Sequence, residues 1–329
     1  MKIAVDVMGF ENEVSEAVSA IELFTRLHSD LEVVIVGDEN KIKSALQEES
    51  SNRIEILHTD QFVTQDDSIL VLRTKNNSSM QLAANLLKEN KVDGLLSAGN
   101  SSIFVFIMYS TIGLLPGVSK LGFMPTIPTI DGQVCNMIDV GANIDCSPED
   151  LVKFAIMASV YASQRVNNPT VAILANGTEH HKGRQLEKDT AALLEKTSLN
   201  YIGYIEANKI FNHTADVIVT DGFTGNLVLK ALEGTGKVMS DFLKKEYKKS
   251  WNIFAALLSI PIFKKMKKTF DYKENAGAFV LGLNQICVKT HGSADKQQFL
   301  SSLRMLYDSI KNNVINNIKT EITNYEQSK

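Results

Sequence analysis

The sequence predicts an α/β fold in which a mainly parallel sheet lies between two layers of helices. Apolar runs of strand length alternate with amphipathic segments of helix length along most of the 329 residues. Several of the apolar runs end in short loops rich in glycine and small polar residues, as strand-to-helix connections do. The chain length suits one large α/β domain or two smaller lobes, and we expect residues 1–329 to form a single domain.

The expected elements follow one another in a regular order. Strands are predicted at 3–7, 31–36, 54–58, 93–96, 137–140, 170–174, 200–206 and 215–219. Helices are predicted at 13–27, 42–47, 79–89, 103–112, 148–162, 184–196 and from 227 onward. The prolines between 113 and 136 exclude a long helix there, so extended segments are expected to cross the sheet in this region.

The clearest local signal lies between Cys135 and Asp150. A short apolar run breaks at 141–143, where Gly141 permits a tight turn. A helix then restarts with Ser147 as its N-cap and Pro148 at its first position. Asp150 stands three residues after Ser147, which is the spacing of a capping box. This stretch therefore predicts a strand, a polar loop and a helix in succession.

Four predicted strands end in loops of similar chemistry, each of which feeds a helix. The loops cover 97–102, 139–145, 176–183 and 221–226. In a parallel sheet all four would lie on one edge, where free backbone N–H groups and positive helix ends converge. Any one such loop is typical of an ordinary strand-to-helix turn. The four together favour a binding site for an anion such as phosphate.

Several kinds of chemistry are not indicated. The chain has no Walker A pattern, no GxSxG nucleophile elbow and no His/Cys group with zinc-ligand spacing, so neither a metal nor a cofactor is expected. A net charge of −4 gives no reason to expect nucleic-acid binding. The three cysteines form no CxxC pair and are expected to be reduced thiols of a cytosolic protein.

Residues 241–273 differ in composition from the rest of the chain. Lysines flank an aromatic and aliphatic middle, which is too short to span a bilayer, and Pro261 marks a bend. This pattern predicts a basic, apolar helical hairpin on an anionic membrane surface. The alternative is a dimer contact with solvated lysines. The side chains expected to contact the membrane are Trp251, Phe254, Leu257, Leu258, Ile262 and Phe263.

Taken together, these motifs resemble the PlsX family, the phosphate acyltransferases of bacterial phospholipid synthesis. The resemblance spans nearly the whole chain and is carried by residues 6–9, 78–80, 97–100, 139–146, 182–183, 200–203, 210–211, 215–217, 221–226 and 289–293. It implies a homodimer with a three-layer Rossmann-like αβα sandwich related to isopropylmalate dehydrogenases and phosphotransacetylases. Departures from the family pattern occur at Phe10, at 101–103, at Ser119-Lys120 and at 276–279.

The resemblance also implies an activity and its partners. Acyl-carrier-protein thioester and inorganic phosphate would give acyl phosphate and free carrier protein. The protein would be cytoplasmic and bound peripherally to the inner face of the cell membrane. There it would pass acyl phosphate to a glycerol-3-phosphate acyltransferase for phosphatidic acid synthesis.

This chemistry needs an anion cradle and hydrogen-bond donors around the attacked thioester carbonyl. The expected substrate and phosphate site comprises Ser97, Asn100, Ser101, Asp139, Asn143, Asp145 and Gly222. The expected catalytic residues are Lys182, Asn226, Asp221 and His291. In this hypothesis Lys182 supplies positive charge, Asp139 or Asp221 orients the donors, and His291 or His180 protonates the leaving thiolate.

Two other functions fit the same sequence. One is a phosphotransacylase that uses coenzyme A thioesters, which a comparison of carrier protein with coenzyme A would distinguish. The other is a catalytically silent scaffold at the membrane surface. The four polar loops argue against a scaffold, which would have no use for them.

Overall fold

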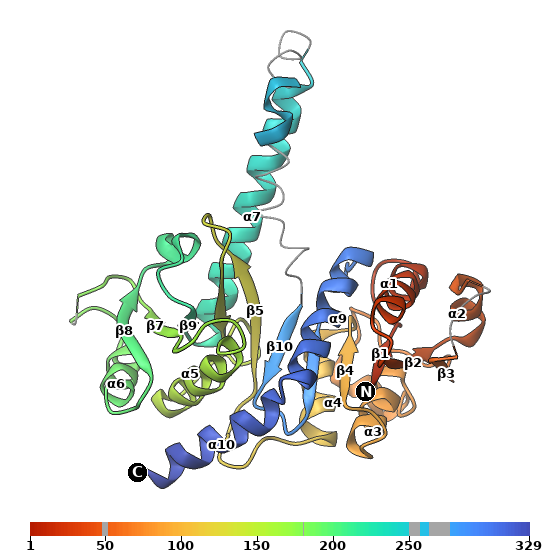
Figure 1. Ribbon diagram of the computed structural model, residues 1–329, viewed down its shortest axis with the longest axis horizontal. Coiled ribbons are helices and arrows are strands. Elements are labelled where there is room, and N and C mark those ends of the chain that lie inside the picture. Colours follow the sequence, from red (N-terminus) through yellow and green to blue (C-terminus); the bar gives the residue numbers. More distant parts are fainter. Residues whose placement is uncertain (48–51, 180, 250–256, 263–276) are drawn as a thin grey trace.

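The protein is described here from a computed structural model over residues 1–47, 52–179, 181–249, 257–262 and 277–329. Over these residues eleven strands form one sheet, in the order β3-β2-β1-β4-β11-β10-β5-β6-β9-β7-β8 (Figure 1). Helices pack against both faces of this sheet. The predicted three-layer αβα fold class is therefore confirmed.

The strands are short and mostly buried. They are β1 (Lys2–Asp6), β2 (Glu32–Gly37), β3 (Ile54–His58), β4 (Gly94–Ser97), β5 (Gly122–Pro128), β6 (Val134–Ile138), β7 (Thr170–Leu174), β8 (Asn200–Ile205), β9 (Val217–Val219), β10 (Ala278–Leu281) and β11 (Ile286–Lys289). The helices are α1 (Val14–Leu27), α2 (Glu39–Ala45), α3 (Ser79–Lys88), α4 (Ser101–Thr111), α5 (Pro148–Ala162), α6 (Gln185–Leu194), α7 (Gly222–Tyr247), α9 (Lys296–Lys311) and α10 (Val314–Gln327), with short 3-10 helices η1 (Ile69–Arg73) and η2 (Ala207–Asn212).

The sheet consists of two parallel groups that run in opposite directions. The strands β3, β2, β1, β4 and β11 are mutually parallel, and so are β6, β9, β7 and β8. Between the groups the pairs β11–β10, β10–β5 and β5–β6 are all antiparallel. Three reversals turn the carboxyl ends of the second group toward the opposite edge of the sheet.

This topology corrects the prediction that the four polar loops share one edge. The loops at 139–145, 176–183 and 221–226 follow β6, β7 and β9, which are parallel and end on a common edge. The loop at 97–102 follows β4, which belongs to the other group. The prediction was wrong because the proline-containing region folds back as the β5–β6 hairpin and reverses the strand direction.

The two helical layers have separate cores. One face of the sheet packs against α1, α5, α6, α9 and α10, and the other packs against α3, α4 and the first turns of α7. Two residues that depart from the family pattern, Phe10 and Phe279, pack in the core on the face covered by α1, α5 and α9. Phe10 packs edge-on against Phe299, with ring centroids 5.3 Å apart. Phe279 is fully buried with its ring centroid 5.1 Å from that of Tyr161.

Polar caps set where several helices begin. Ser147 Oγ accepts the backbone N–H of Asp150 at 3.2 Å, and the Asp150 carboxylate accepts the Ser147 N–H at 2.8 Å, so the predicted capping box at α5 is confirmed. The helices α4 and α7 each start earlier than predicted, because Asn100 and Asp221 are N-caps whose side chains accept amides of the first turn.

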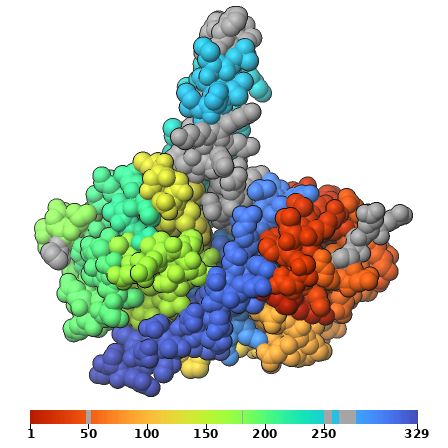
Figure 2. Space-filling view, in the orientation of Figure 1, coloured from red at the N-terminus to blue at the C-terminus, as the bar shows by residue number. Residues whose placement is uncertain are grey.

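The helix α7 extends well beyond the sheet, as the projecting arm in Figures 1 and 2 shows. Residues 257–262 are helical, and the Tyr247 hydroxyl donates to Ser259 Oγ at 3.5 Å, which places this segment beside the end of α7. The hairpin over 241–273 stays a prediction, because 250–256 and 263–276 lie outside the described residues. The predicted membrane contacts Leu257, Leu258 and Ile262 are exposed, whereas Trp251, Phe254 and Phe263 lie outside the described residues.

Among the described residues, no helix is both long enough and apolar enough to span a membrane.

Candidate functional site

The loop that follows β6 is organised around one buried carboxylate. Asp139 has no exposed surface, and its oxygens accept the backbone N–H groups of Phe123, Gly141, Ala142 and Asn143 at 2.8–3.1 Å. The Asn143 amide donates to Asp139 Oδ2 as well, at 2.8 Å. Burial raises the pKa of Asp139, and these hydrogen bonds oppose the increase. Asp139 thus shapes the loop from inside, which fits the predicted orienting role.

The first turn of α7 rests directly on this loop. A Cβ atom on Gly222 would lie 2.2 Å from the Asn143 carbonyl oxygen, and one on Gly225 would lie 1.9 Å from the Asp139 carbonyl oxygen. Neither position has room for a side chain. Asn226, one residue further on, lies beside Gly141. Glycine therefore permits the close approach that brings Asn226 to the loop.

Asp221 joins α6 to α7. Its carboxylate accepts the backbone N–H of Thr224 at 2.8 Å and the Thr224 hydroxyl at 2.9 Å, and it forms an ion pair with Arg184. Arg184 also bonds to Glu187, near the start of α6. Burial raises the pKa of Asp221, but the hydrogen bonds from Thr224 and Arg184 outweigh it and hold the pKa below its usual value.

Arg184 was not among the predicted site residues. The available signal was a second cation two residues after Lys182, at the first residue of a predicted helix. Lys182 itself is half-buried and folds over Gly177. Within the part of the chain that the structure describes, its ammonium has no ion-pair or hydrogen-bond partner, so it is available to an anion. The alternative proton donor, His180, lies outside the described residues.

The start of α4 forms the other side of the candidate site. Asn100 Oδ1 accepts the backbone N–H groups of Ser102 and Ile103, at 3.0 and 3.1 Å, and its amide donates to the carbonyl oxygens of Gln65 and Asp67. Asn100 therefore fixes the first turn of α4. Ser101 and Ser102 follow it with exposed side chains at the positive end of the helix dipole.

The remaining predicted residues lie around this framework. Ser97 is fully buried and donates its hydroxyl to Asp6 at 2.7 Å. His291 is exposed just after β11, with its Nδ1 2.8 Å from the Ser293 hydroxyl. The Asp145 side chain is exposed, and its carbonyl accepts a hydrogen bond from Lys120.

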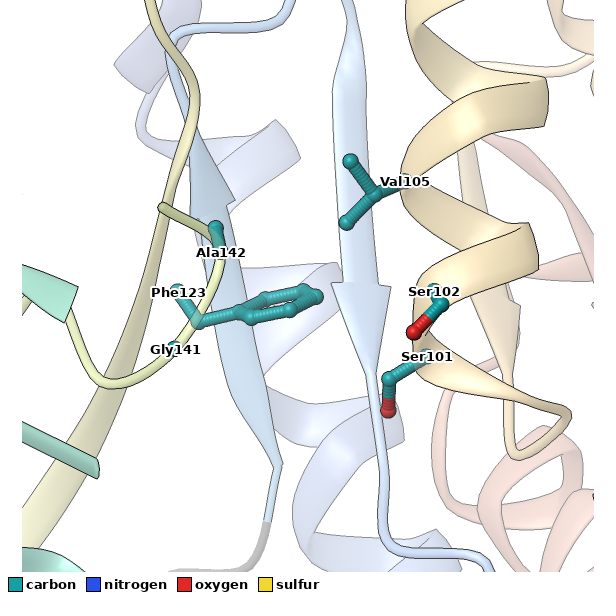
Figure 3. A pocket seen from close by; sticks show the side chains of 6 residues that line it. All are labelled: Ser101, Ser102, Val105, Phe123, Gly141 and Ala142. Atoms are coloured by element: carbon teal, nitrogen blue, oxygen red, sulfur yellow. The ribbon is translucent and has the colours of Figure 1, made fainter. Parts of the chain in front are cut away.

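A hollow separates α4 from the loop after β6. It has a volume of about 190 Å³ and is lined by Ser101, Ser102, Val105, Phe123, Gly141 and Ala142. Figure 3 shows Phe123 and Ala142 facing the two serines and Val105 across it. The hollow thus combines hydroxyl groups and a helix N-terminus with an apolar wall. Such a space can hold an anion next to an apolar group.

The two opposed halves of the sheet therefore meet at one hollow. Of the predicted site residues, Ser101 lines it, and Asn100 and Asn143 adjoin lining residues in the chain. Asn226 contacts the lining residue Gly141. The roles assigned to all these residues stay predictions.

A comparison with known proteins assigns the chain to a family. The model of the family described as fatty acid synthesis protein matches residues 1–317. The chain is 52% identical to the phosphate acyltransferase of Ureaplasma parvum over 326 residues, which cover 99% of this chain and 98% of that protein. It is 39% identical to the phosphate acyltransferase of Mycoplasma genitalium over 329 residues, which cover 99% of each.

The chain belongs to the fatty acid synthesis protein family. This is the PlsX family that its motifs resemble, and as a member the chain is an acyltransferase.

Solved structures show that the fold extends beyond the PlsX family. A phosphotransacetylase from Streptococcus pyogenes has a TM-score of 0.59 at 17% identity and covers 98% of this chain and 94% of its own. A 4-hydroxythreonine-4-phosphate dehydrogenase from Klebsiella pneumoniae has a TM-score of 0.56 at 10% identity and covers 94% of this chain and 99% of its own. These likenesses concern the fold and confirm the predicted phosphotransacetylase-like architecture.

Proposed function

We propose that the protein transfers a fatty acyl group from acyl-carrier protein to inorganic phosphate. Membership of a fatty acid synthesis family and relatives named phosphate acyltransferase support acyl transfer to phosphate. The product, acyl phosphate, would serve phosphatidic acid synthesis through a downstream glycerol-3-phosphate acyltransferase.

The hollow between α4 and the loop after β6 is the observation that carries this proposal. The hydroxyls of Ser101 and Ser102, at the positive end of α4, offer donors for phosphate. Val105 and Phe123 offer an apolar wall for the acyl chain next to the thioester. A phosphate and an acyl thioester can therefore meet here.

The reaction requires one bond to form and one to break. A phosphate oxygen attacks the thioester carbonyl carbon, the carbon–sulfur bond breaks, and the carrier-protein thiolate takes up a proton. Negative charge develops on the carbonyl oxygen during this step and is stabilised by fixed donors. Lys182 and Asn226 supply positive charge and an amide on the side of α7, and His291 protonates the thiolate. Asp221 holds the start of α7.

The projecting arm supports a peripheral membrane role. Val238, Met239 and Phe242 are each at least 60% exposed on α7, and Leu258 and Ile262 are exposed on the segment beside the end of α7. Lys244 and Lys245 lie in the last turn of α7. Exposed apolar side chains next to lysines fit an anionic membrane surface on the inner face of the cell membrane. The alternative is that the arm contacts a second copy of the chain in a homodimer.

The test is incubation of the protein with acyl-carrier-protein thioester and labelled phosphate, followed by trapping of acyl phosphate with hydroxylamine. We expect phosphate-dependent hydroxamate and release of free carrier protein. A parallel reaction with acyl coenzyme A separates the two acyl donors. Faster turnover with acyl coenzyme A would identify it, and not acyl-carrier protein, as the acyl donor. Absence of hydroxamate with both donors would reject the proposed function.

A further inference from the structure

A charged cluster lies buried under the loop that opens α4. Asp6 is 1% exposed and Lys289 is 6% exposed, and they end β1 and β11. Both residues are in register with Ser97 at the end of β4 between them. The three side chains therefore lie in one row on one face of the sheet. This is the face that α3 and α4 cover.

Short hydrogen-bonded links connect this cluster to the loop. The Ser97 hydroxyl donates to Asp6 Oδ2 at 2.7 Å and accepts the backbone N–H of Gly99 at 3.1 Å. On the other side, the Lys289 ammonium donates to the Thr290 carbonyl, and the Thr290 N–H donates to the Ser97 carbonyl at 3.0 Å. Both charged residues thus act on the residues immediately before Asn100.

The loop has little freedom to move independently of the cluster. A Cβ atom on Gly99 would lie 2.5 Å from Met80 Cε and 3.7 Å from Asp6 Oδ2, so the Gly99 backbone packs directly over the carboxylate. A displacement of Asp6 would therefore shift Gly99 and, with it, the cap at Asn100.

The cluster is also close to the hollow. Lys289 is opposite Ala278 of β10, and Ala278 is opposite Pro125 of β5. Phe123, which lines the hollow, is two residues from Pro125 on the same strand. The row that contains the buried side chains thus reaches β5 two residues from the apolar wall of the hollow.

Stability alone does not account for these charges. Removing a carboxylate and an ammonium from water costs free energy that their attraction rarely exceeds, and an apolar pair of similar volume is often as stable. Burial raises the pKa of Asp6, with hydrogen bonds from Ser79 and Ser97 in opposition, and burial lowers the pKa of Lys289 to about 7. Buried ionisable groups whose pKa values are shifted in this way are concentrated at functional sites.

We propose that Asp6 and Lys289 are positioning residues that hold the loop at 97–100, and through it Ser101, in the geometry that binds phosphate. This inference rests on the proposed function. It assigns to the two residues an effect on phosphate that is separate from their effect on folding.

The test compares charge-removing variants by steady-state kinetics. Asp6→Asn and Lys289→Met are expected to raise the KM for phosphate about tenfold, because a small displacement of a positioning loop weakens binding strongly. The KM for acyl-carrier protein should stay within about twofold, and Lys289→Arg should recover part of the phosphate affinity. The effect of the double variant on phosphate binding should be smaller than the sum of the two single effects in free energy, because the two residues act on one loop.

Lys153→Met is the matched control. Lys153 is 8% exposed on α5 and pairs with Glu326 at 2.8 Å, on the opposite face of the sheet. We expect this variant to lower the melting temperature without changing the KM for phosphate. The inference would be overturned if Lys153→Met raised the KM for phosphate as much as the test variants do. It would also be overturned if Asp6→Asn and Lys289→Met left that KM unchanged.

Two further outcomes are informative. If the charge-removing variants do not fold, Ser97→Ala decides the question, because Ser97 links Asp6 to Gly99, and an unchanged KM for phosphate in this variant overturns the inference. If the wild-type protein shows no phosphate-dependent transfer, the proposed function fails and this inference fails with it. If the wild-type protein is active and the variants leave the KM for phosphate unchanged, this inference fails while the proposed function stands.

Discussion

Single residues in the candidate site divide into those that shape loops and those that remain available to a ligand. Asp139, Asn100 and Ser97 direct their polar atoms into the protein and fix backbone segments. The Ser101 hydroxyl lines the hollow, and the Lys182 ammonium has no ion-pair or hydrogen-bond partner within the part of the chain that the structure describes. From the sequence alone these two classes are indistinguishable, because both are polar residues at strand ends.

Lys182 provides the first prediction at this scale. Lys182→Ala should lower acyl-phosphate formation at least tenfold, because it removes a cation that no described side chain neutralises. The measurement is hydroxylamine trapping with labelled phosphate. Lys196→Ala is the control, since Lys196 is exposed beyond the far end of α6. Unchanged turnover in Lys182→Ala would remove Lys182 from the mechanism.

Two glycines of α7 give a matched pair of variants. Gly225→Ala should destabilise the protein by about 1–3 kcal/mol and lower activity, because its Cβ would collide with the Asp139 carbonyl. Gly234→Ala has nothing within 4 Å and should stabilise α7 by up to about 1 kcal/mol. Thermal unfolding measures both. Equal effects of the two substitutions would show that α7 does not rest on the loop.

Asp150 gives a prediction about pH. Burial raises the pKa of Asp150, but hydrogen bonds from Ser119 and Ser147 outweigh it and hold the pKa below its usual value, and Lys120 adds to this effect. A lowered folded-state pKa stabilises the protein fully above the unfolded pKa of about 3.9, and the contribution is lost as pH falls through the folded value. Ser119-Lys120, a departure from the family pattern, thus supports the α5 cap.

Asp150→Asn should therefore lower the free energy of unfolding by about 1–2 kcal/mol at pH 7. The difference between wild type and variant should shrink as pH falls from 5 toward 3. Urea unfolding at a series of pH values measures it. A difference that stays constant down to pH 3 would show that the carboxylate form of Asp150 contributes nothing.

At the scale of elements, local signals predicted most helices and strands of the first two thirds of the chain. The α5 cap and the loops at the strand ends could be predicted from the sequence, because each depends on residues that are neighbours in the chain. Strand direction was not predicted, since β5 pairs antiparallel with β10 from a distant part of the chain, and the β5–β6 hairpin then reverses the strands that follow. The same holds for Asp6 and Lys289, which only the sheet brings together.

The arm formed by α7 carries its own prediction. Val238, Met239 and Phe242 occupy adjacent positions on one side of the helix. Phe242→Glu should reduce cosedimentation with phosphatidylglycerol vesicles about tenfold, because it places a carboxylate in the apolar patch. Leu27→Glu, at the exposed end of α1, is the control and should leave binding unchanged. Unchanged vesicle binding with loss of a dimer in ultracentrifugation would assign the arm to self-association.

For the whole molecule, the arrangement of the two halves decides where chemistry takes place. Three antiparallel pairings turn the halves in opposite directions, yet α4 from one half and the loop after β6 from the other border one hollow. A site made in this way combines a helix N-terminus with a loop held by a buried carboxylate. Neither half of the sheet supplies both the helix N-terminus and the loop.

A crystal structure with inorganic phosphate bound tests this arrangement most directly. We predict a phosphate in the hollow, with an oxygen within hydrogen-bonding distance of the Ser101 or Ser102 hydroxyl at the start of α4. A phosphate held by Lys182 and Arg184 alone, with the hollow between the two halves unoccupied, would contradict the proposed site.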